Sequence, residues 1–232
     1  SLRGGTDVLI NAVVTSAGTV IAEADFDNSN NGTLTDAGGG NFIAGDLFAG
    51  GHVVNLTDDD TTLATLAGSA QENYTFDTPA SYDVGIVNTV TGVTSEFGNI
   101  NLDTDGTITV GGVVESLTGS VDITATGAGA TVNVSANVSG DDVTITGATL
   151  NVTAATENAI GGTTLNADTG TLDIDGDVTA HGSIVLQGAA NIELTANLHA
   201  DDSVTVANNI LLDDVGPGAF SITADDGNIT FS

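Results

Sequence analysis

An internal repeat of about 20 residues in the second half of the chain restricts its fold more than any other feature. The repeated phrase is a small residue, then Thr or Asn, then an apolar residue, any residue and a second apolar residue. Self-similarity at such a period is typical of solenoids, in which each repeat forms one coil that stacks on its neighbours. The first apolar positions of the phrase are Ile108, Val132, Leu150, Leu172, Ile192, Ile210 and Ile229.

Two further apolar series run in step with the first one. One begins at Ile100, Val121, Val143, Leu165, Ile184, Val204 and Phe220, and a shorter one at Val114, Val138, Ile160, Val178, Leu198 and Val215. Within each phrase every second residue is apolar, which is the side-chain period of a β-strand. The sequence therefore predicts an all-β chain: a right-handed parallel β-solenoid (β-helix) with three strands per turn of about 20 residues. A β-sandwich explains alternating strands, but it does not explain three series that return in phase.

A polar residue precedes each phrase of the first series. We expect these residues to stack as a ladder along the solenoid axis, because stacked Asn amides hydrogen bond to the coils above and below. Such a ladder has a structural role. Its expected members are Thr107, Thr131, Thr149, Thr171, Asn191, Asn209 and Asn228.

The two halves of the chain differ in regularity. Residues 98–232 read as regular solenoid rungs, whereas residues 1–97 read as a less regular, aromatic-richer portion of the same solenoid with excursions. Within this portion, residues 72–83 resemble a long excursion or edge strand more than a rung. We interpret the whole chain as one continuous solenoid and not as two independent domains.

Composition excludes several classes of function. The chain has 31 acidic residues against one Lys or Arg, so its formal net charge is −30, and nucleic-acid binding lacks the cations it needs. Membrane insertion is not expected, because the sequence has no apolar run of about 18 residues. The absence of Cys removes disulfides, Cys-ligated zinc and thiol nucleophiles. A 40% apolar content is enough for a core, so the chain is not expected to be disordered.

Candidate catalytic groups are few. His52, His181 and His199 are the only imidazoles. The phasing places His199 beside Thr179, two positions from His181, so these two histidines are either a metal pair or solvent-facing corner residues, and we favour the latter. We find no nucleophile elbow and no Ser-His-Asp arrangement, and carboxylates are too plentiful to reveal a glycosidase pair. The sequence therefore predicts a protein that is not an enzyme.

Acidic turns are the strongest candidates for a ligand site. The pairs Asp141–Asp142 and Asp201–Asp202 lie about three turns apart, and both precede a strand of the same series. Stacked carboxylates repel each other, and a hard divalent cation would relieve the repulsion. Calcium is the one cofactor that the sequence suggests, with these four residues as candidate ligands. The alternative is that they form ordinary Asp turns on a charged surface.

Residues 170–188, which read GTLDIDGDVTAHGSIVLQG, resemble the repeats of filamentous-haemagglutinin-type and autotransporter adhesins of bacteria. The resemblance covers about residues 98–232 and concerns the style of the repeat. It implies a secreted β-helix associated with the bacterial cell surface, whose rungs act as a spacer or as an adhesive stalk.

The strands near both ends of the sequence suggest self-association. A terminal rung exposes apolar core and unpaired backbone, so we expect head-to-tail stacking or further chain to cover it, with Arg3, Ile229 and Phe231 as candidate contacts. We therefore expect a non-enzymatic extracellular structural protein: a subunit of a surface filament or fibre, or a stalk segment of a large adhesin. Cell-surface glycans and extracellular matrix are the other expected partners. The alternative is a secreted β-helix that binds or cleaves carbohydrate, with Tyr74 and Tyr82 as stacking platforms.

Overall fold

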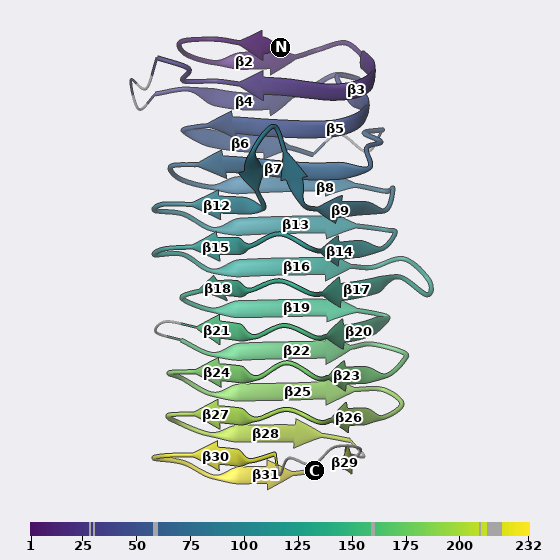
Figure 1. Ribbon diagram of the computed structural model, residues 1–232, viewed down its shortest axis with the longest axis vertical. Helices are drawn as coiled ribbons and strands as arrows, with labels where there is room; N and C mark the ends of the chain where they lie inside the picture. Colours follow the sequence, from purple (N-terminus) through teal and green to yellow (C-terminus); the bar gives the residue numbers. More distant parts are fainter. Residues whose placement is uncertain (28, 30, 58–59, 159–160, 209, 213–219) are drawn as a thin grey trace.

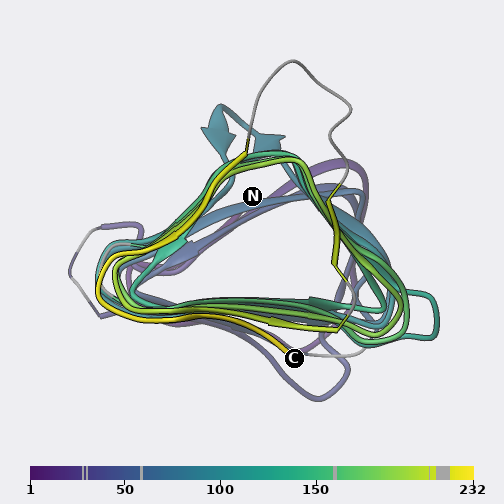
Figure 2. The same cartoon turned by 90° about the horizontal axis from the view of Figure 1, so that it is seen from below.

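The computed structural model describes residues 1–27, 29, 31–57, 60–158, 161–208, 210–212 and 220–232. Its regular elements are all β-strands in this part of the chain, and they stack into a solenoid of triangular cross-section (Figures 1 and 2). Every pairing between coils is parallel. The predicted all-β parallel solenoid with three strands per turn is therefore confirmed. In the described ranges, no helix is long and apolar enough to cross a membrane.

Face 1 is a parallel sheet of eleven strands that runs the whole length of the molecule. Eleven strands at about 4.8 Å each give a stack of roughly 50 Å. Its strands are β2 (Val8–Ile10), β4 (Thr33–Asp36), β6 (Val53–Leu56), β8 (Tyr74–Thr78), β13 (Ile100–Thr104), β16 (Val121–Ala125), β19 (Val143–Gly147), β22 (Thr163–Ala167), β25 (Ile184–Gly188), β28 (Val204–Ala207) and β31 (Ile229–Phe231).

The other two sides of the triangle, faces 2 and 3, follow face 1 in each turn. Face 2 contains β9 (Tyr82–Val84), β14 (Ile108–Val110), β17 (Thr131–Val134), β20 (Thr149–Val152), β23 (Leu172–Ile174), β26 (Ile192–Leu194) and β29 (Ile210–Leu212). Face 3 contains β12 (Val93–Ser95), β15 (Val114–Ser116), β18 (Val138–Gly140), β21 (Thr156–Asn158), β24 (Val178–Ala180), β27 (Leu198–Ala200) and β30 (Ile222–Ala224).

The first coils connect faces 2 and 3 by longer strands. These are β3 (Val14–Glu23), β5 (Phe42–Gly51) and β7 (Thr65–Ala70), and β1 (Leu2–Arg3) pairs with the end of β3. Strand β7 pairs with β9 of face 2 and with β12 of face 3. A single long strand of the early coils therefore covers the positions that two shorter strands occupy in the later coils.

The core is built from inward side chains that stack from coil to coil, so each coil buries its neighbours' apolar atoms. Full burial of one such side chain stabilises the fold by about 1.5–3 kcal/mol. One core column of face 1 contains Leu34, Val54, Tyr74, Ile100, Val121, Val143, Thr163, Ile184, Val204 and Ile229. The second contains Leu56, Phe76, Leu102, Ile123, Ile145, Leu165, Leu186, Val206 and Phe231.

The predicted phase is wrong at two coils. Leu165 aligns with Ile145 and not with Val143, because Thr163 takes the inward position next to Val143. At the end of the chain Ile229 pairs with Val204 of face 1, although the repeat placed it in face 2. The last turn, from Val204 to Ile229, is longer than the regular repeat, so counting regular turns assigned this strand to the wrong face.

The same long turn moves two further predicted positions. Asn228 precedes β31 and therefore does not belong to the ladder of face 2. Phe220 precedes β30 of face 3 and is not part of face 1.

The shorter apolar series also departs from its prediction at one strand of face 3. In strand β21 the position in register with Val138 and Val178 is occupied by Thr156. Three of the predicted positions, Ile160, Asn209 and Val215, lie outside the described residues.

Residues 72–83 form regular rungs, so the predicted excursion there is wrong. Strand β8 pairs with β6 and β13, and β9 pairs with β14. The excursion comes directly afterwards, as a small antiparallel hairpin of β10 (Ile86–Val87) and β11 (Val90–Thr91) that projects from the triangle (Figures 1 and 2). Val87 packs against Phe48 and Ala67 on the outer surface of the solenoid, which anchors the hairpin.

Buried hydroxyl groups close several corners. Thr104 Oγ1 donates to the carbonyl of Ala80 (2.8 Å) and accepts from the Gly106 amide (2.9 Å). Ser116 Oγ donates to the carbonyl of Gly98 (2.7 Å) and accepts from the Gly119 amide (2.8 Å). These contacts satisfy backbone groups that leave the parallel ladders at the turns.

Candidate functional site

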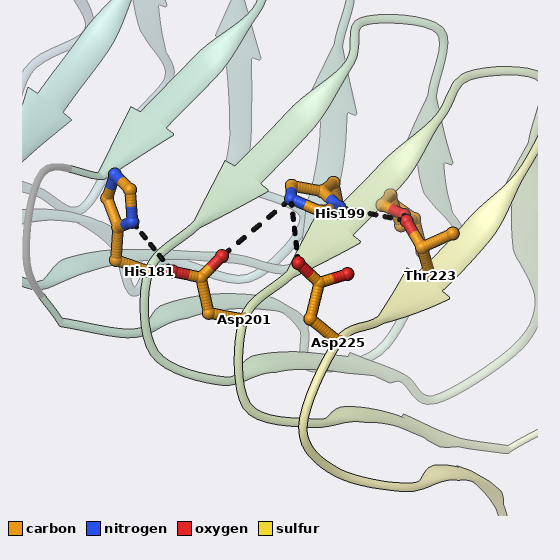
Figure 3. Close-up of polar contacts among 6 residues, drawn as sticks. His181, His199, Asp201, Thr223 and Asp225 are labelled. Atoms are coloured by element: carbon orange, nitrogen blue, oxygen red, sulfur yellow. Dashed lines mark hydrogen bonds and ion pairs between the residues drawn. The ribbon is translucent and has the colours of Figure 1, made fainter.

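A cluster of His and Asp side chains lies on the last coils, at the corner that follows face 3. Ala180, Ala200 and Ala224 are paired in register on β24, β27 and β30. The residues that follow them, His181, Asp201 and Asp225, therefore occupy the same corner on three successive coils (Figure 3).

His199 reaches this corner from the middle of β27. It points outward between Thr179 and Thr223, its partners in register on the neighbouring strands. The predicted placement of His199 beside Thr179 is thus confirmed. Its Nε2 atom lies 3.7 Å from Asp201 Oδ1 and 4.0 Å from Asp225 Oδ2.

Asp201 is the centre of the cluster, because its two carboxylate oxygens face different histidines. Oδ2 lies 2.8 Å from His181 Nδ1, while Oδ1 faces His199. The side chains are accessible to solvent: 44% of His199, 41% of Asp201 and 60% of Asp225 is exposed. Within the described ranges, His199, Asp201 and Asp225 form the one group of three potential metal ligands whose atoms lie within 4.8 Å of one another.

The four candidate calcium ligands do not form a common site. The corner of Asp141 and Asp142 precedes β19, and the corner of Asp201 and Asp202 precedes β28. Three coil steps separate the two corners, about 14 Å, so no single cation contacts both pairs. Asp142 Oδ1 accepts a hydrogen bond from the Gly162 amide (2.8 Å).

The predicted ladder residues that belong to face 2 lie half-buried on its outer side; these are Thr107, Thr131, Thr149, Thr171 and Asn191. Thr131 and Thr149 are partners in register, and the carbonyls of Thr171 and Asn191 accept hydrogen bonds from the strands beside them. An amide-to-amide contact is present two positions further along each strand, where Asn151 Nδ2 donates to Asn133 Oδ1 (2.7 Å). The sequence pattern predicted stacked amides at the residue before the first apolar position of each strand, and it did not identify Asn133 and Asn151 as such a pair.

The three candidate self-association residues differ in their surroundings. Arg3 already has a partner within the chain: its Nε lies 2.9 Å from Glu23 Oε2, and its guanidinium lies over the Phe26 ring, 4.4 Å from the centroid. Ile229 and Phe231 are the last members of the two core columns of face 1, and they are 42% and 55% exposed.

Tyr74 and Tyr82 are buried, so the expectation that they form stacking platforms for sugars is wrong. They are 0% and 2% exposed, and the Tyr82 ring meets Phe76 edge to face at 5.1 Å. Burial raises the pKa of both phenols. Both side chains lie at inward positions of their strands, β8 and β9.

A groove of about 520 Å³ runs along face 3 over the first coils. Its floor is an outward row of small residues in register, Gly50, Ser69 and Thr94, with Glu23 at one end and Glu115 at the other. Four coil steps separate the two glutamates, about 19 Å. Residues further along the same strands complete the lining: Gln71, Glu96 and Leu117.

Carboxylates also stack on the outer surfaces. Asp103 pairs in register with Asp77 on face 1. Desolvation and then the Asp77 charge raise the pKa of Asp103, against a lowering contribution from a backbone hydrogen bond. On face 2, desolvation, followed by the charges of Asp175 and Glu193, raises the pKa of Asp173.

Comparisons with protein families, with curated proteins and with solved structures found no match to this chain.

Proposed function

We propose that this chain is a rod-like segment of a secreted bacterial surface protein, used as a spacer in a fibre or in an adhesin stalk. The observation that carries the proposal is the pair of core columns of face 1, which run through the coils and end at the exposed Ile229 and Phe231. A coil placed beneath them would bury both side chains and pair the open edge of β31.

Two further features support this proposal. The repeat resembles those of filamentous-haemagglutinin-type and autotransporter adhesins, which form stalks on bacterial surfaces. The net charge of −30 keeps such rods apart from each other and from the anionic cell envelope. The proposed role requires no catalytic group.

The location is tested by immunogold labelling of intact source cells with antibodies against the purified chain. We expect gold particles on the outer surface and at a distance from it. Labelling that appears only after lysis would contradict the proposal.

The way in which the last coil is covered needs a separate experiment. If a second copy covers it, sedimentation velocity shows end-to-end species that grow with protein concentration, and electron micrographs show rods in steps of roughly 50 Å. Phe231→Asp abolishes these species, whereas the control Phe97→Asp, at a side chain that is 68% exposed on the flank of the rod, retains them. A monomer at all concentrations would exclude a second copy as the cover.

The groove on face 3 supports a second candidate function, the binding of glycans. A row of small residues with carboxylates at both ends offers an extended surface with hydrogen-bond acceptors, and its charge favours neutral or amino sugars over acidic ones. Glycan-array binding that is lost in Glu115→Gln and retained in Glu193→Gln, on the distant strand β26, would support this function. Equal binding by both variants, or none by the wild type, would exclude it.

A further inference from the structure

The tautomer of His199 is determined by its hydrogen bonds. Its Nδ1 atom lies 3.0 Å from Thr223 Oγ1, and the Thr223 hydroxyl donates its own proton to the carbonyl of Leu198 (3.2 Å). Thr223 therefore accepts a hydrogen bond, which His199 donates from Nδ1–H. In the neutral ring, the proton is on Nδ1 and the Nε2 lone pair is free.

This lone pair faces two carboxylates. Nε2 lies 3.7 Å from Asp201 Oδ1 and 4.0 Å from Asp225 Oδ2 (Figure 3). Three electron-pair donors therefore converge, and in the part of the chain that the structure describes no hydrogen-bond donor lies between them. Three such atoms repel one another unless a cation lies among them, either a proton on Nε2 or a metal ion.

The surrounding contacts resemble the outer shell of a metal site. A metal-binding His usually donates its second ring N–H to a fixed acceptor, and a metal-binding carboxylate is usually held by a further hydrogen bond. Thr223 supplies the first contact and His181, at 2.8 Å from Asp201 Oδ2, supplies the second. Asp201 Oδ1 is thereby directed toward His199.

We infer that His199 Nε2, Asp201 Oδ1 and Asp225 Oδ2 bind one divalent transition-metal ion of the zinc type, with water completing the coordination. Imidazole suits Zn²⁺, Ni²⁺ and Co²⁺, whereas Ca²⁺ takes oxygen ligands alone. Ligand atoms in a tetrahedral zinc site with bonds of about 2.0 Å lie about 3.3 Å apart. The present distances of 3.7 and 4.0 Å reach this value through small rotations of exposed side chains.

Such an ion would join two coils, because Asp201 and Asp225 belong to successive turns while His199 lies on the first of them. It would therefore hold the last coil, which includes β30, against β27. This role is additional to the proposed spacer function and does not depend on it.

The experiment is calorimetric titration of the full chain with Zn²⁺ in a millimolar excess of Mg²⁺, which occupies the general acidic surface. We expect one Zn²⁺ per chain in the wild type. His199→Ala and Asp225→Asn should each weaken binding at least tenfold. The matched control His52→Ala should not, because His52 lies on an early coil beside Gln71 and Glu72.

Two further measurements separate binding from folding. Circular dichroism in EDTA checks that each variant is folded, and the visible spectrum of bound Co²⁺ reports nitrogen and oxygen coordination. Thr223→Val should weaken Zn²⁺ binding through the orientation of His199, by about tenfold, and Thr223→Ser should restore it. Equal Zn²⁺ binding by the wild type and His199→Ala, or binding to the acidic surface alone, would overturn the inference.

Discussion

Asp77 and Asp103 lie opposite each other on the outer side of face 1, in register on the neighbouring strands β8 and β13. Like charges that face each other across strands destabilise a sheet. Together with partial desolvation, the Asp77 charge raises the pKa of Asp103 above its ordinary value of 3.8. The acidic composition thus lowers the stability of the fold locally, where the register of the coils brings two carboxylates together.

Replacing Asp103 by Asn should stabilise the chain at pH 7 by about 0.5 kcal/mol, because it removes one of two facing charges. A group with a raised pKa in the folded state contributes stability that is fully present below its unfolded pKa and is lost as the pH rises through the folded pKa. The advantage of Asp103→Asn should therefore be largest at neutral pH and should disappear below about pH 3.8.

Urea denaturation at pH 7 and at pH 3.5 measures this difference. The control is Asp83→Asn, since Asp83 also points outward but has Thr65 and Thr109 as its partners in register. A gain of equal size in both variants would show that the pairing with Asp77 is irrelevant.

Thr163 provides a second prediction, because it occupies a core position between Val143 and Ile184. Thr163 is 0% exposed, and its Oγ1 has no hydrogen-bond partner among the described residues. Thr163→Val keeps the shape of the side chain and removes a buried, unsatisfied hydroxyl, so it should stabilise the chain by about 1 kcal/mol. Thermal unfolding compares it with Thr164→Val at the neighbouring outward position. A lower melting temperature for Thr163→Val than for the wild type would indicate that the hydroxyl is hydrogen bonded.

Thr163 also shows why the sequence predicted the fold better than the register. Alternation of apolar residues was sufficient for the fold class and for the three faces, because it depends only on which side chains point inward. The register depends on the length of each turn. A polar residue in the core at Thr163 shifted the expected phase from Thr163 to Leu165, and an unusually long last turn moved Ile229 to another face.

The candidate site, like the register, could be predicted from the sequence only in part. Between β24 and β27 the repeat has its regular length, so counting residues was sufficient to place His199 beside Thr179. The approach of Asp225 to His199 depends on the long last turn, which no periodic count contains. The hydrogen bonds of Thr223 that orient the imidazole depend on side-chain conformations, for which a repeat pattern carries no signal.

Tyr74 and Gly68 provide a third prediction, because a Cβ atom at Gly68 would lie 2.5 Å from the Tyr74 hydroxyl oxygen. The ring fills a space that exists only because position 68 has no side chain. Tyr74→Phe should be neutral or stabilise the chain by about 1 kcal/mol, since the buried hydroxyl has no hydrogen-bond partner in the part of the chain that the structure describes. Tyr74→Ala should destabilise it by about 3–5 kcal/mol through the cavity that it leaves. Chemical denaturation measures both, and a large loss in Tyr74→Phe would contradict the assignment.

Substitutions at two glycines with positive φ allow the effect of backbone strain to be distinguished from that of a steric clash. Gly92, at the end of the hairpin, has φ +79°, and a Cβ atom there would lie 1.8 Å from the carbonyl oxygen of Val113. Gly129 has φ +80°, but a Cβ atom there would have no atom of another described residue, apart from its chain neighbours, within 4 Å. Gly129→Ala should therefore lower the free energy of unfolding by about 1–2 kcal/mol, from the backbone conformation alone. Gly92→Ala should lower it by more than about 3 kcal/mol, because β12 and β15 must also separate. Denaturation midpoints compare the two variants, and hydrogen exchange of the Val93 amide, which donates to Val113, reports the local opening. Equal losses in both variants would show that the coils at this corner move apart without cost, in contradiction to the close stacking of the solenoid.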